Sequence, residues 1–320
     1  MSVLVFLDQA DGHIKKSSFE AANYGAKVAE QLGSYAEAIV LGSVKDDLAF
    51  IGNYGIKKVH TVSNAALNNL DTQVYTKIIA QAVESTGADV IVFSNNTSGK
   101  SIAPRLSVCL KAGLVSGAIA LPDLSNGFTV KKTVFSGKAF ANIVVTSAKK
   151  IISLNPNSFN IVTGTGTAEV APFTANIEMA KVEVTSVNKV IGEVSLSEAE
   201  VVVSGGRGLK GPENWGFVTE LATLLGAATA CSRPVADSDW RPHHEHVGQT
   251  GLAIAPNLYI AIGISGAIQH LAGVNRSKTI VVINKDPEAP FFKAADYGIV
   301  GDAFEVMPKI IEAVKKIKEA

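Results

Sequence analysis

Short apolar runs rich in β-branched residues alternate with helical patterns over the first third of the chain. The runs that predict strands are Val3–Leu7, Ala38–Leu41, Lys58–Val62 and Asp89–Phe93. The segments between them carry helix-start signals: Ser17-Ser18-Phe19-Glu20 fits a capping box, and Asp71 is the predicted N-cap of a helical pattern that runs to Val83. Repeated strand–helix–strand units predict a parallel sheet flanked by helices.

The pattern changes after Leu121, where strand-like runs follow one another with only turn-length gaps. These runs are Phe128–Phe135, Ala139–Thr146 and Ile151–Asn155, and they predict antiparallel strands added at the edge of the first sheet. Ser186–Glu200 mixes polar and apolar residues without a helical face and is the predicted linker. We therefore expect an N-terminal domain at residues 1–190 and a C-terminal domain at residues 198–320.

The alternation of strands and helices returns in the C-terminal part. The predicted strands there are Ala199–Ser204, Ala227–Ser232, Leu258–Ser265, Thr279–Asn284 and Gly298–Asp302. Each run ends in a polar residue, and open parallel sheets bind ligands outside the carboxyl ends of their strands. The sequence thus predicts an α/β protein of two domains, each a mainly parallel open sheet flanked by helices, with a ligand site at the carboxyl edge of the second.

Composition and charge narrow the classes of function. The 29 basic and 29 acidic residues cancel, so no long-range field favours nucleic acid or an anionic membrane. Hydrophobic residues make up 47% of the chain, yet the longest apolar stretch, Leu258–Ile268, is shorter than the ~20 residues of a membrane span. No secretory signal pattern is present, so we expect a cytoplasmic protein. Cys109 and Cys231 stand in no metal-ligand spacing, and we expect no metal.

Residues Gly206–Gly211 match the glycine pattern G-x-G-x-x-G after an apolar strand. An NAD site should place an acidic residue at the end of the second strand, but the sequence there is Cys231-Ser232-Arg233. An arginine can instead receive a 2′-phosphate, which leaves an NADP site open. A tight turn whose glycines only permit packing also remains open.

Three further segments resemble catalytic or binding motifs, but each lacks a feature that the motif requires. Residues 263–267 (Gly-Ile-Ser-Gly-Ala) resemble a nucleophile elbow, but the last glycine and the required order of serine, acid and histidine are missing. Residues 243–246 (His-His-Glu-His) lack the spacing of a helical zinc pair, which favours a solvated loop. Residues 94–101 end like a P-loop but begin with serine, which favours a turn leading into a helix.

Several runs of the C-terminal part occur together in one order. They are VVSGGRGL at 202–209, SRP at 232–234, VGQTG at 247–251, GISGAIQHLAG at 263–273 and INKDPEAP at 283–290. This ensemble resembles the alpha, or large, subunits of the electron transfer flavoproteins. The N-terminal half is similar to that family mainly in layout, most clearly from Gly99-Lys100 to Pro104-Arg105. One departure is His246, where family members often carry glutamine.

The resemblance implies an FAD held at the carboxyl edge of the C-terminal domain, and a beta-subunit partner that covers the flavin and carries AMP. The FAD contacts that it implies are Arg207, Ser232, Arg233, Val247, Gly248, Gln249, Thr250, Ser265, Gly266, Ala267, Ile268, Gln269, His270, Asn284, Asp302 and Ala303. It further implies a heterodimeric shuttle that carries electrons from flavin dehydrogenases, such as the acyl-CoA dehydrogenases of fatty acid β-oxidation, to a membrane quinone oxidoreductase. Two alternatives stay open: an NADP-dependent oxidoreductase using the Gly206–Gly211 turn, and a nucleotide sensor whose N-terminal domain is an interaction module.

In such a site the flavin supplies the redox chemistry, so no catalytic acid or base is required. Arg233 is placed to stack on or hydrogen-bond the flavin ring and to favour its charged reduced forms. His270 is placed to donate toward the pyrimidine edge, and Thr250 toward N5 of the flavin. Asn284 and Asp302 suit the ADP portion, where the carboxylate can accept from ribose hydroxyls.

Overall fold

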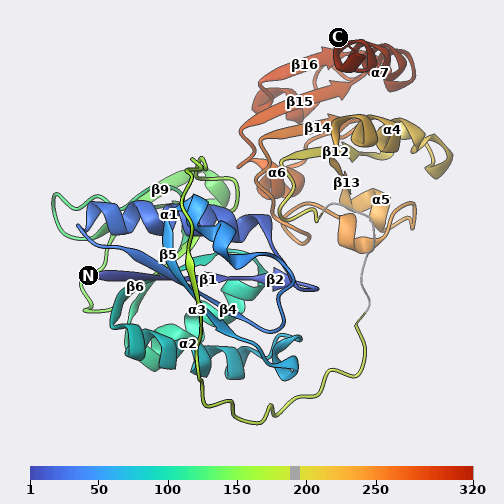
Figure 1. The fold of residues 1–320 in the computed structure, drawn as a ribbon. Coiled ribbons are helices and arrows are strands. Elements are labelled where there is room, and N and C mark those ends of the chain that lie inside the picture. The colour runs from blue at the N-terminus through green and yellow to red at the C-terminus, as the bar shows by residue number, and fades with distance from the viewer. Residues whose placement is uncertain (188–194, 320) are drawn as a thin grey trace. The chain divides into compact units, whose positions relative to one another are not determined.

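The computed structural model describes residues 1–187 and 195–319, which form two compact units joined through the intervening segment (Figure 1). The predicted linker, residues 186–200, lies in large part outside the described residues. Each unit has its own sheet and its own hydrophobic core. Among the described residues, no helix combines the length and the apolar character that a bilayer crossing needs.

The first unit is built on one nine-stranded sheet. Its order is β11-β5-β4-β1-β6-β10-β7-β8-β9. The strands are β1 (Ser2–Leu7), β4 (Ala36–Leu41), β5 (Ile56–Val62), β6 (Ala88–Ser94), β7 (Gly113–Ala118), β8 (Thr129–Val134), β9 (Ala139–Val144), β10 (Lys150–Leu154) and β11 (Glu169–Pro172). A small hairpin of β2 (Gln9–Ala10) and β3 (His13–Ile14) follows β1. Only the β7–β8 and β8–β9 pairs of this large sheet are antiparallel.

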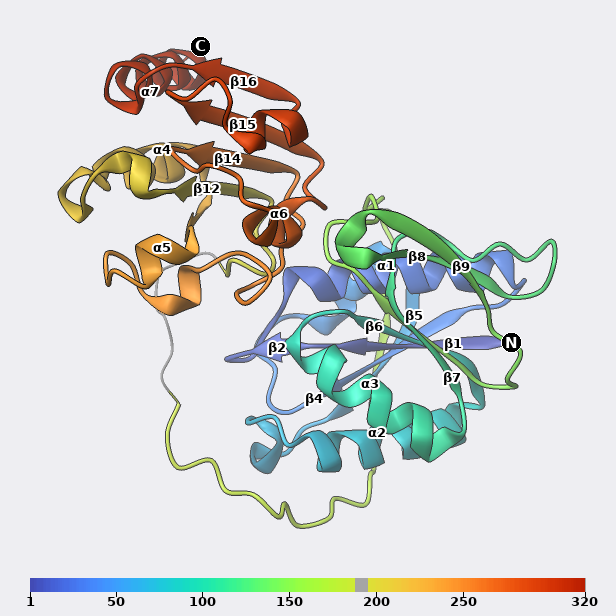
Figure 2. The ribbon, with the colours of Figure 1, turned by 180° about the vertical axis from the view of Figure 1, so that it is seen from behind.

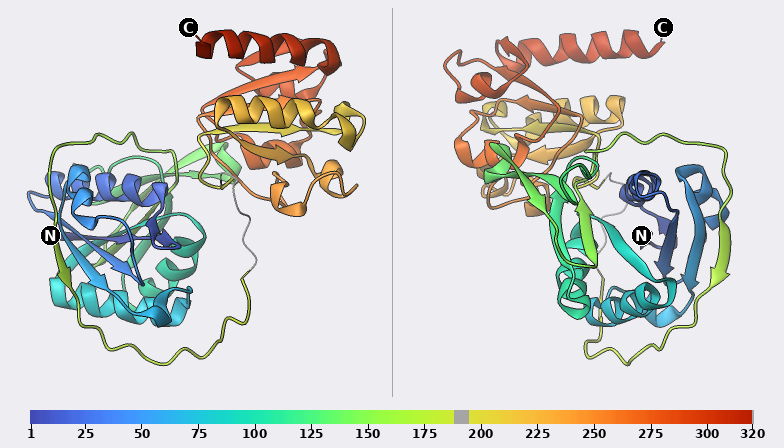
Figure 3. Two further views of the ribbon diagram at one scale, coloured as in Figure 1. Left: turned by 45° about the vertical axis from the view of Figure 1, so that its right-hand side comes forward. Right: turned by 90° about the vertical axis from the view of Figure 1, so that its left-hand side faces the viewer.

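Helices cover both faces of this sheet (Figures 2 and 3). Helix α1 (Lys16–Gln31) packs on one face with the side chains of β1 that include Val3 and Val5. Helices α2 (Thr72–Thr86) and α3 (Thr97–Leu110) pack on the other face. The short 3₁₀ helices are η1 (Leu48–Tyr54), η2 (Ala65–Leu67) and η3 (Phe135–Gly137). Burial on both faces explains why the central strands are continuously apolar instead of alternating.

Two sequence predictions for this unit are wrong. Strand β10 is not an antiparallel edge strand: it is parallel and lies between β6 and β7, where it is fully buried. The capping box also fails, because α1 begins at Lys16 and Ser18 instead exchanges hydrogen bonds with the backbone of Asp8. The carboxylate of Glu20 accepts three backbone N–H groups from residues 157–159. Ser18 and Glu20 therefore form hydrogen bonds with other segments of the chain and do not cap the helix.

Other predictions for this unit are confirmed. Asp71 caps α2, accepting from the N–H groups of Gln73 and Val74 at 2.8 and 3.0 Å. Strands β8 and β9 do form an antiparallel pair at the sheet edge. Strands β7 and β11 were not predicted. Strand β11 pairs with β5 at the edge of the sheet, because residues 156–187 run back past that edge (Figure 3).

The second unit is a five-stranded, fully parallel sheet. The strands are β12 (Val201–Gly205), β13 (Ala228–Cys231), β14 (Leu258–Ile262), β15 (Thr279–Asn284) and β16 (Tyr297–Val300), in the order β13-β12-β14-β15-β16. Helices α4 (Gly216–Leu225), α5 (Arg233–Ala236) and α7 (Ala303–Glu319) pack with one core, and α6 (Ile268–Val274) packs with the other. The 3₁₀ helices are η4 (Arg207–Leu209), η5 (Pro212–Asn214), η6 (His243–Glu245) and η7 (Pro290–Ala294).

All of the C-terminal strands that the sequence predicts are present. The order places β13 on one side of β12 and β14 on the other. The strand order therefore reverses at a switch point between β12 and β14. Such a switch point is where doubly wound sheets bind their ligands. Of the polar residues predicted at the strand ends, Ser232, Ser265 and Asp302 follow their strands. Asn284 is the last residue of β15, and Ser204 is inside β12 and completely buried.

Candidate functional site

The turns that follow β12 and β14 touch at the switch point. The N–H of Gly206 donates to the carbonyl of Ile262 at 2.9 Å, and the N–H of Gly208 donates to the carbonyl of Gly263 at 3.0 Å. A Cβ atom on Gly206 would lie 2.3 Å from the Gly263 oxygen, and Gly263 itself has a φ of +63°. The G-x-G-x-x-G glycines therefore serve the packing of two turns, which places both turns beside one cavity.

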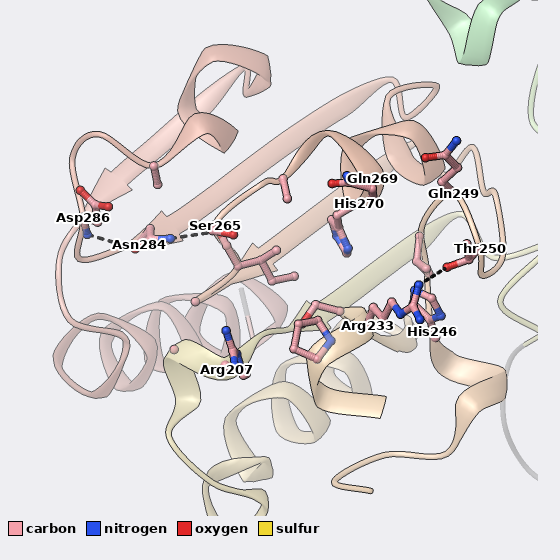
Figure 4. Close-up of a pocket in the computed structure, with 18 residues that line it drawn as sticks. Arg207, Arg233, His246, Gln249, Thr250, Ser265, Gln269, His270, Asn284 and Asp286 are labelled. Atoms are coloured by element: carbon pink, nitrogen blue, oxygen red, sulfur yellow. Dashed lines mark hydrogen bonds between the residues drawn. The ribbon is translucent and has the colours of Figure 1, made fainter. Parts of the chain in front are cut away.

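A cavity of about 540 Å³ opens at this edge of the sheet (Figure 4). Its size is within the range of cofactor pockets, ~300 to 1,000 Å³. The predicted site residues that line it are Arg207, Ser232, Arg233, Val247, Gln249, Thr250, Ser265, Ala267, Gln269, His270 and Asn284. They come from the ends of β12, β13, β14 and β15 and from the loop after η6.

Five predicted residues do not line this cavity. Gly248 and Gly266 shape the backbone beside it, since a Cβ on Gly266 would lie 2.4 Å from the Phe291 side chain. Ile268 points into solvent. Asp302 caps α7 by accepting from the N–H of Phe304 at 3.0 Å, and Ala303 is buried at the start of that helix.

Several lining residues were not predicted as contacts. They are Gly208, Pro234, His246, Gly263, Ile264, Asp286 and Ala289. All of them except His246 lie within the motif runs at 202–209, 232–234, 263–273 and 283–290, and His246 directly precedes the run at 247–251. The sequence does not show in which direction each side chain points, so it could not tell which residues of a run line the cavity.

Two arginines bring permanent positive charge to the cavity. Arg233 begins α5, donates from Nε to Asp237 Oδ2 at 3.2 Å and from Nη1 to Thr250 Oγ1 at 3.4 Å, and stays 61% exposed. The side chain of Arg207, in η4, has no hydrogen bond or ion pair within residues 1–187 and 195–319. Charged and planar donors at a switch point suit an anionic, phosphate-bearing ligand.

His270 borders the cavity as a neutral ring. Its Nε2 lies 2.8 Å from the hydroxyl of Tyr259, and its ring packs edge-on against Phe291 at a centroid distance of 5.7 Å. Burial, together with the nearby His246, lowers the pKa of His270 to about 4, against a small opposing effect of the Val247 backbone. Its Nδ1 is buried and forms no hydrogen bond of normal geometry with the described residues.

The Asn284 side chain ties the ends of β14 and β15 together. Its Nδ2 donates to the carbonyl of Ile264 at 2.9 Å, and its Oδ1 accepts from the N–H of Asp286 at 3.0 Å (Figure 4). Asn284 thereby fixes the loop that carries Asp286, the acidic side chain among the lining residues. Asn284 positions the wall of the cavity in addition to lining it.

A doubly wound sheet with glycine turns at its switch point and two arginines in a cavity there defines a nucleotide- or dinucleotide-binding protein. Within the described residues, no three His, Cys, Asp or Glu side chains gather in a group that could hold a metal ion.

Comparisons with known proteins give the family. Residues 3–186 match the electron transfer flavoprotein domain, and residues 195–275 match the electron transfer flavoprotein FAD-binding domain. The chain belongs to the alpha subunits of the electron transfer flavoproteins, as the sequence motifs predicted.

Individual relatives agree along the whole chain. The chain is 36% identical over 323 residues to the electron transfer flavoprotein subunit alpha of Bacillus subtilis (strain 168), covering 98% of both chains. It is 36% identical over 325 residues to the subunit alpha of Thermoanaerobacterium thermosaccharolyticum, covering 99% of this chain and 98% of the relative. It is 34% identical over 333 residues to the protein FixB of Clostridium saccharobutylicum, covering 99% and 97%.

Proposed function

We propose that the switch-point cavity holds FAD and that the residues lining it bind and tune the flavin. The observation that carries this proposal is the convergence of Arg207, Arg233 and the neutral ring of His270 on one cavity within the unit that matches an FAD-binding domain. The FAD supplies the electron-accepting chemistry when bound. The chain contributes shape, fixed charge and hydrogen bonds.

Each side chain has a definite task in this proposal. Arg233 offers a charge that cannot be removed by deprotonation, and Thr250 lies within reach of the same region of the cavity. His270 keeps one ring proton, and if Tyr259 donates to Nε2, that proton is on Nδ1 and is available for donation. Arg207 and the turn at Gly208 suit phosphate oxygens. Asp302 and Ala303, which do not line the cavity, would contact only a part of the cofactor that extends beyond it.

We further propose that the chain works as one half of a heterodimeric electron shuttle. Membership of the alpha-subunit family implies a beta subunit as partner. In this proposal the N-terminal domain, residues 1–190, binds the beta subunit, which carries AMP, while residues 198–320 hold FAD. Flavin dehydrogenases, such as those acting on acyl-CoA, deliver electrons, and a membrane quinone oxidoreductase removes them.

An absorbance spectrum of the protein purified with a co-expressed beta subunit tests the cofactor. Flavin bands and release of one FAD per complex are the expected result. A matched Arg207→Ala variant should lower FAD retention, because phosphate oxygens lose a charged donor. A colourless complex that does not take up added FAD, but binds NADP or another nucleotide, would reject the flavin site and favour one of the two alternatives.

A further inference from the structure

The ring of His246 is a polar group at the cavity that forms no hydrogen bond with the described residues. The residue lies just after η6, is only 8% exposed and lines the cavity. Its ring nitrogens have no hydrogen-bond partner within residues 1–187 and 195–319. Buried polar side chains are nearly always hydrogen-bonded. The ring nitrogens of His246 are not fully enclosed, so a group bound in the cavity can supply the missing partner.

The backbone of His246 is held by hydrogen bonds on both sides. Its N–H donates to the carbonyl of His243 at 3.1 Å, and its carbonyl accepts from the N–H of Leu252 at 2.9 Å. Gly251 packs against the ring, since a Cβ there would lie 2.8 Å from Nδ1 of His246. The backbone position from which the ring enters the cavity lining is therefore fixed, and the absence of a side chain at Gly251 leaves room for the ring.

Charged and titratable groups face this ring from several elements. Burial is the main cause that lowers its pKa; Arg233 of α5 and His243 of η6 lower it further, while Asp237, just after α5, raises it. A positive charge on His246 in turn lowers the pKa of His270 in α6. The buried carboxylate of Glu245 is paired with Arg241. With no negative ligand present, this balance favours the neutral ring near neutral pH.

The two cavity imidazoles differ in how easily they gain a proton. His270 is bonded to Tyr259, and its pKa is lowered to about 4. His246 has no such bond and a neighbouring carboxylate in Asp237. A new negative charge in the cavity favours the protonated form of a nearby imidazole. We therefore expect His246 to gain a proton before His270 when negative charge enters the cavity.

We propose that His246 takes up a proton from solvent when the flavin in this cavity is reduced, so that the arrival of an electron is coupled to protonation of this side chain. The proposal rests on the proposed function, since it needs a flavin in the cavity. The electron comes from the donor dehydrogenase, the proton from water to a free ring nitrogen, and no covalent bond to the protein forms or breaks. His246 then pairs with the added negative charge.

Proton uptake on reduction tests this proposal. The FAD-loaded complex is reduced electrochemically through a mediator in weakly buffered solution, and a pH-indicator dye reports protons taken up per electron between about pH 5 and pH 8. The difference between wild type and His246→Gln should form a bell against pH, with a maximum of at most one proton per electron. The His244→Gln control, in the same loop but outside the cavity lining, should behave as wild type.

The outcomes separate this inference from the flavin assignment. If both proteins hold FAD and take up the same number of protons, the role of His246 is wrong and the flavin site stands. If wild type holds no FAD, the proposed function and this inference fail together. If only the glutamine variant loses FAD, NMR titration of the His246 ring in the wild-type complex decides: a higher pKa in the reduced than in the oxidised state supports the proposal, and equal values overturn it.

Discussion

Arg233 brings charge to the cavity while contributing little to the fold. Its ion pair with Asp237 is more than half exposed on both sides, and such pairs contribute at most about 1 kcal/mol. Arg233→Ala should therefore keep the fold. A charge-assisted hydrogen bond to reduced flavin is worth ~1.5 to 3 kcal/mol, so the first-electron potential should fall by on the order of several tens of millivolts or more. Potentiometric titration of the FAD-loaded complex measures this.

The matched control for that measurement is Lys293→Ala. Lys293 is an exposed cation in η7 that does not line the cavity. Salt screens distant surface charges, so its removal should leave the potential nearly unchanged. Equal potentials in wild type and Arg233→Ala would remove Arg233 from the group of flavin-tuning residues.

His270 should make the stability of the protein depend on pH. Its folded-state pKa of about 4 lies below that of an exposed histidine, so the unfolded chain binds more protons at intermediate pH. Stability is therefore lost as the pH falls from about 6.5 towards 4, and the loss between pH 7 and pH 5 should be about 2 kcal/mol. Urea unfolding at the two pH values measures this.

His270→Gln should lose this part of the pH dependence, although it is also less stable at pH 7, because the contact with Tyr259 is weakened. The exposed His243 provides the comparison, and His243→Gln should retain the wild-type dependence. If His270→Gln were as sensitive to acid as wild type, another group would have to carry the effect.

At the scale of secondary-structure elements, the contact between the turns after β12 and β14 determines where the cavity lies. Gly206→Ala puts a methyl group against the Gly263 backbone, which must move. Overpacking of this kind costs ~1 to 3 kcal/mol, and the displaced turns carry Arg207 and Ser265. We expect lower stability and weaker FAD binding, seen by denaturation and by flavin fluorescence.

Gly216→Ala is the matched control. Gly216 lies in the first turn of α4, and a Cβ there meets no atom within 4 Å. Alanine is a better helix residue by up to about 1 kcal/mol, so this variant should be unchanged or slightly stabilised and should bind FAD normally. Weaker FAD binding in both glycine variants would mean that the turn contact is not the cause.

At the scale of the whole molecule, we expect a partner to complete the protein. The described lining of the cavity comes from one edge of one sheet, so we expect one face of a bound flavin ring to stay open to water. Apolar side chains are also exposed on the edge strand β9, among them Phe140 and Val144. Expressed alone, the chain should bind FAD weakly or aggregate, and co-expression with a beta subunit should give a stable yellow 1:1 complex.

Size-exclusion chromatography with detection at a flavin wavelength measures the assembly. A monomer that holds stoichiometric FAD and exchanges electrons at full rate without a partner would contradict the heterodimer. The flavin site itself would survive that result, because its residues all belong to the second unit.

The sequence alone predicted the elements whose signals are local. Apolar runs of strand length predicted β12 to β16, and Asp71 predicted the start of α2. The family resemblance of the motif runs also implied most of the residues that line the cavity, and the rule that parallel strands bring their carboxyl ends to one edge predicted where the site lies. These features depend on neighbours in the chain or on a rule that holds for every parallel sheet.

Tertiary structure decided what depends on distant partners. The runs around β8, β9 and β10 look alike, yet only β10 enters the sheet between β6 and β7, since strand order is set by packing and not by strand propensity. Ser18 exchanges hydrogen bonds with the backbone of Asp8, and Glu20 accepts from the backbone of residues 157–159, so neither caps a helix. Asp302 caps α7, while His246 lines the cavity. A side chain's direction and its partners are fixed only when the remote segments meet.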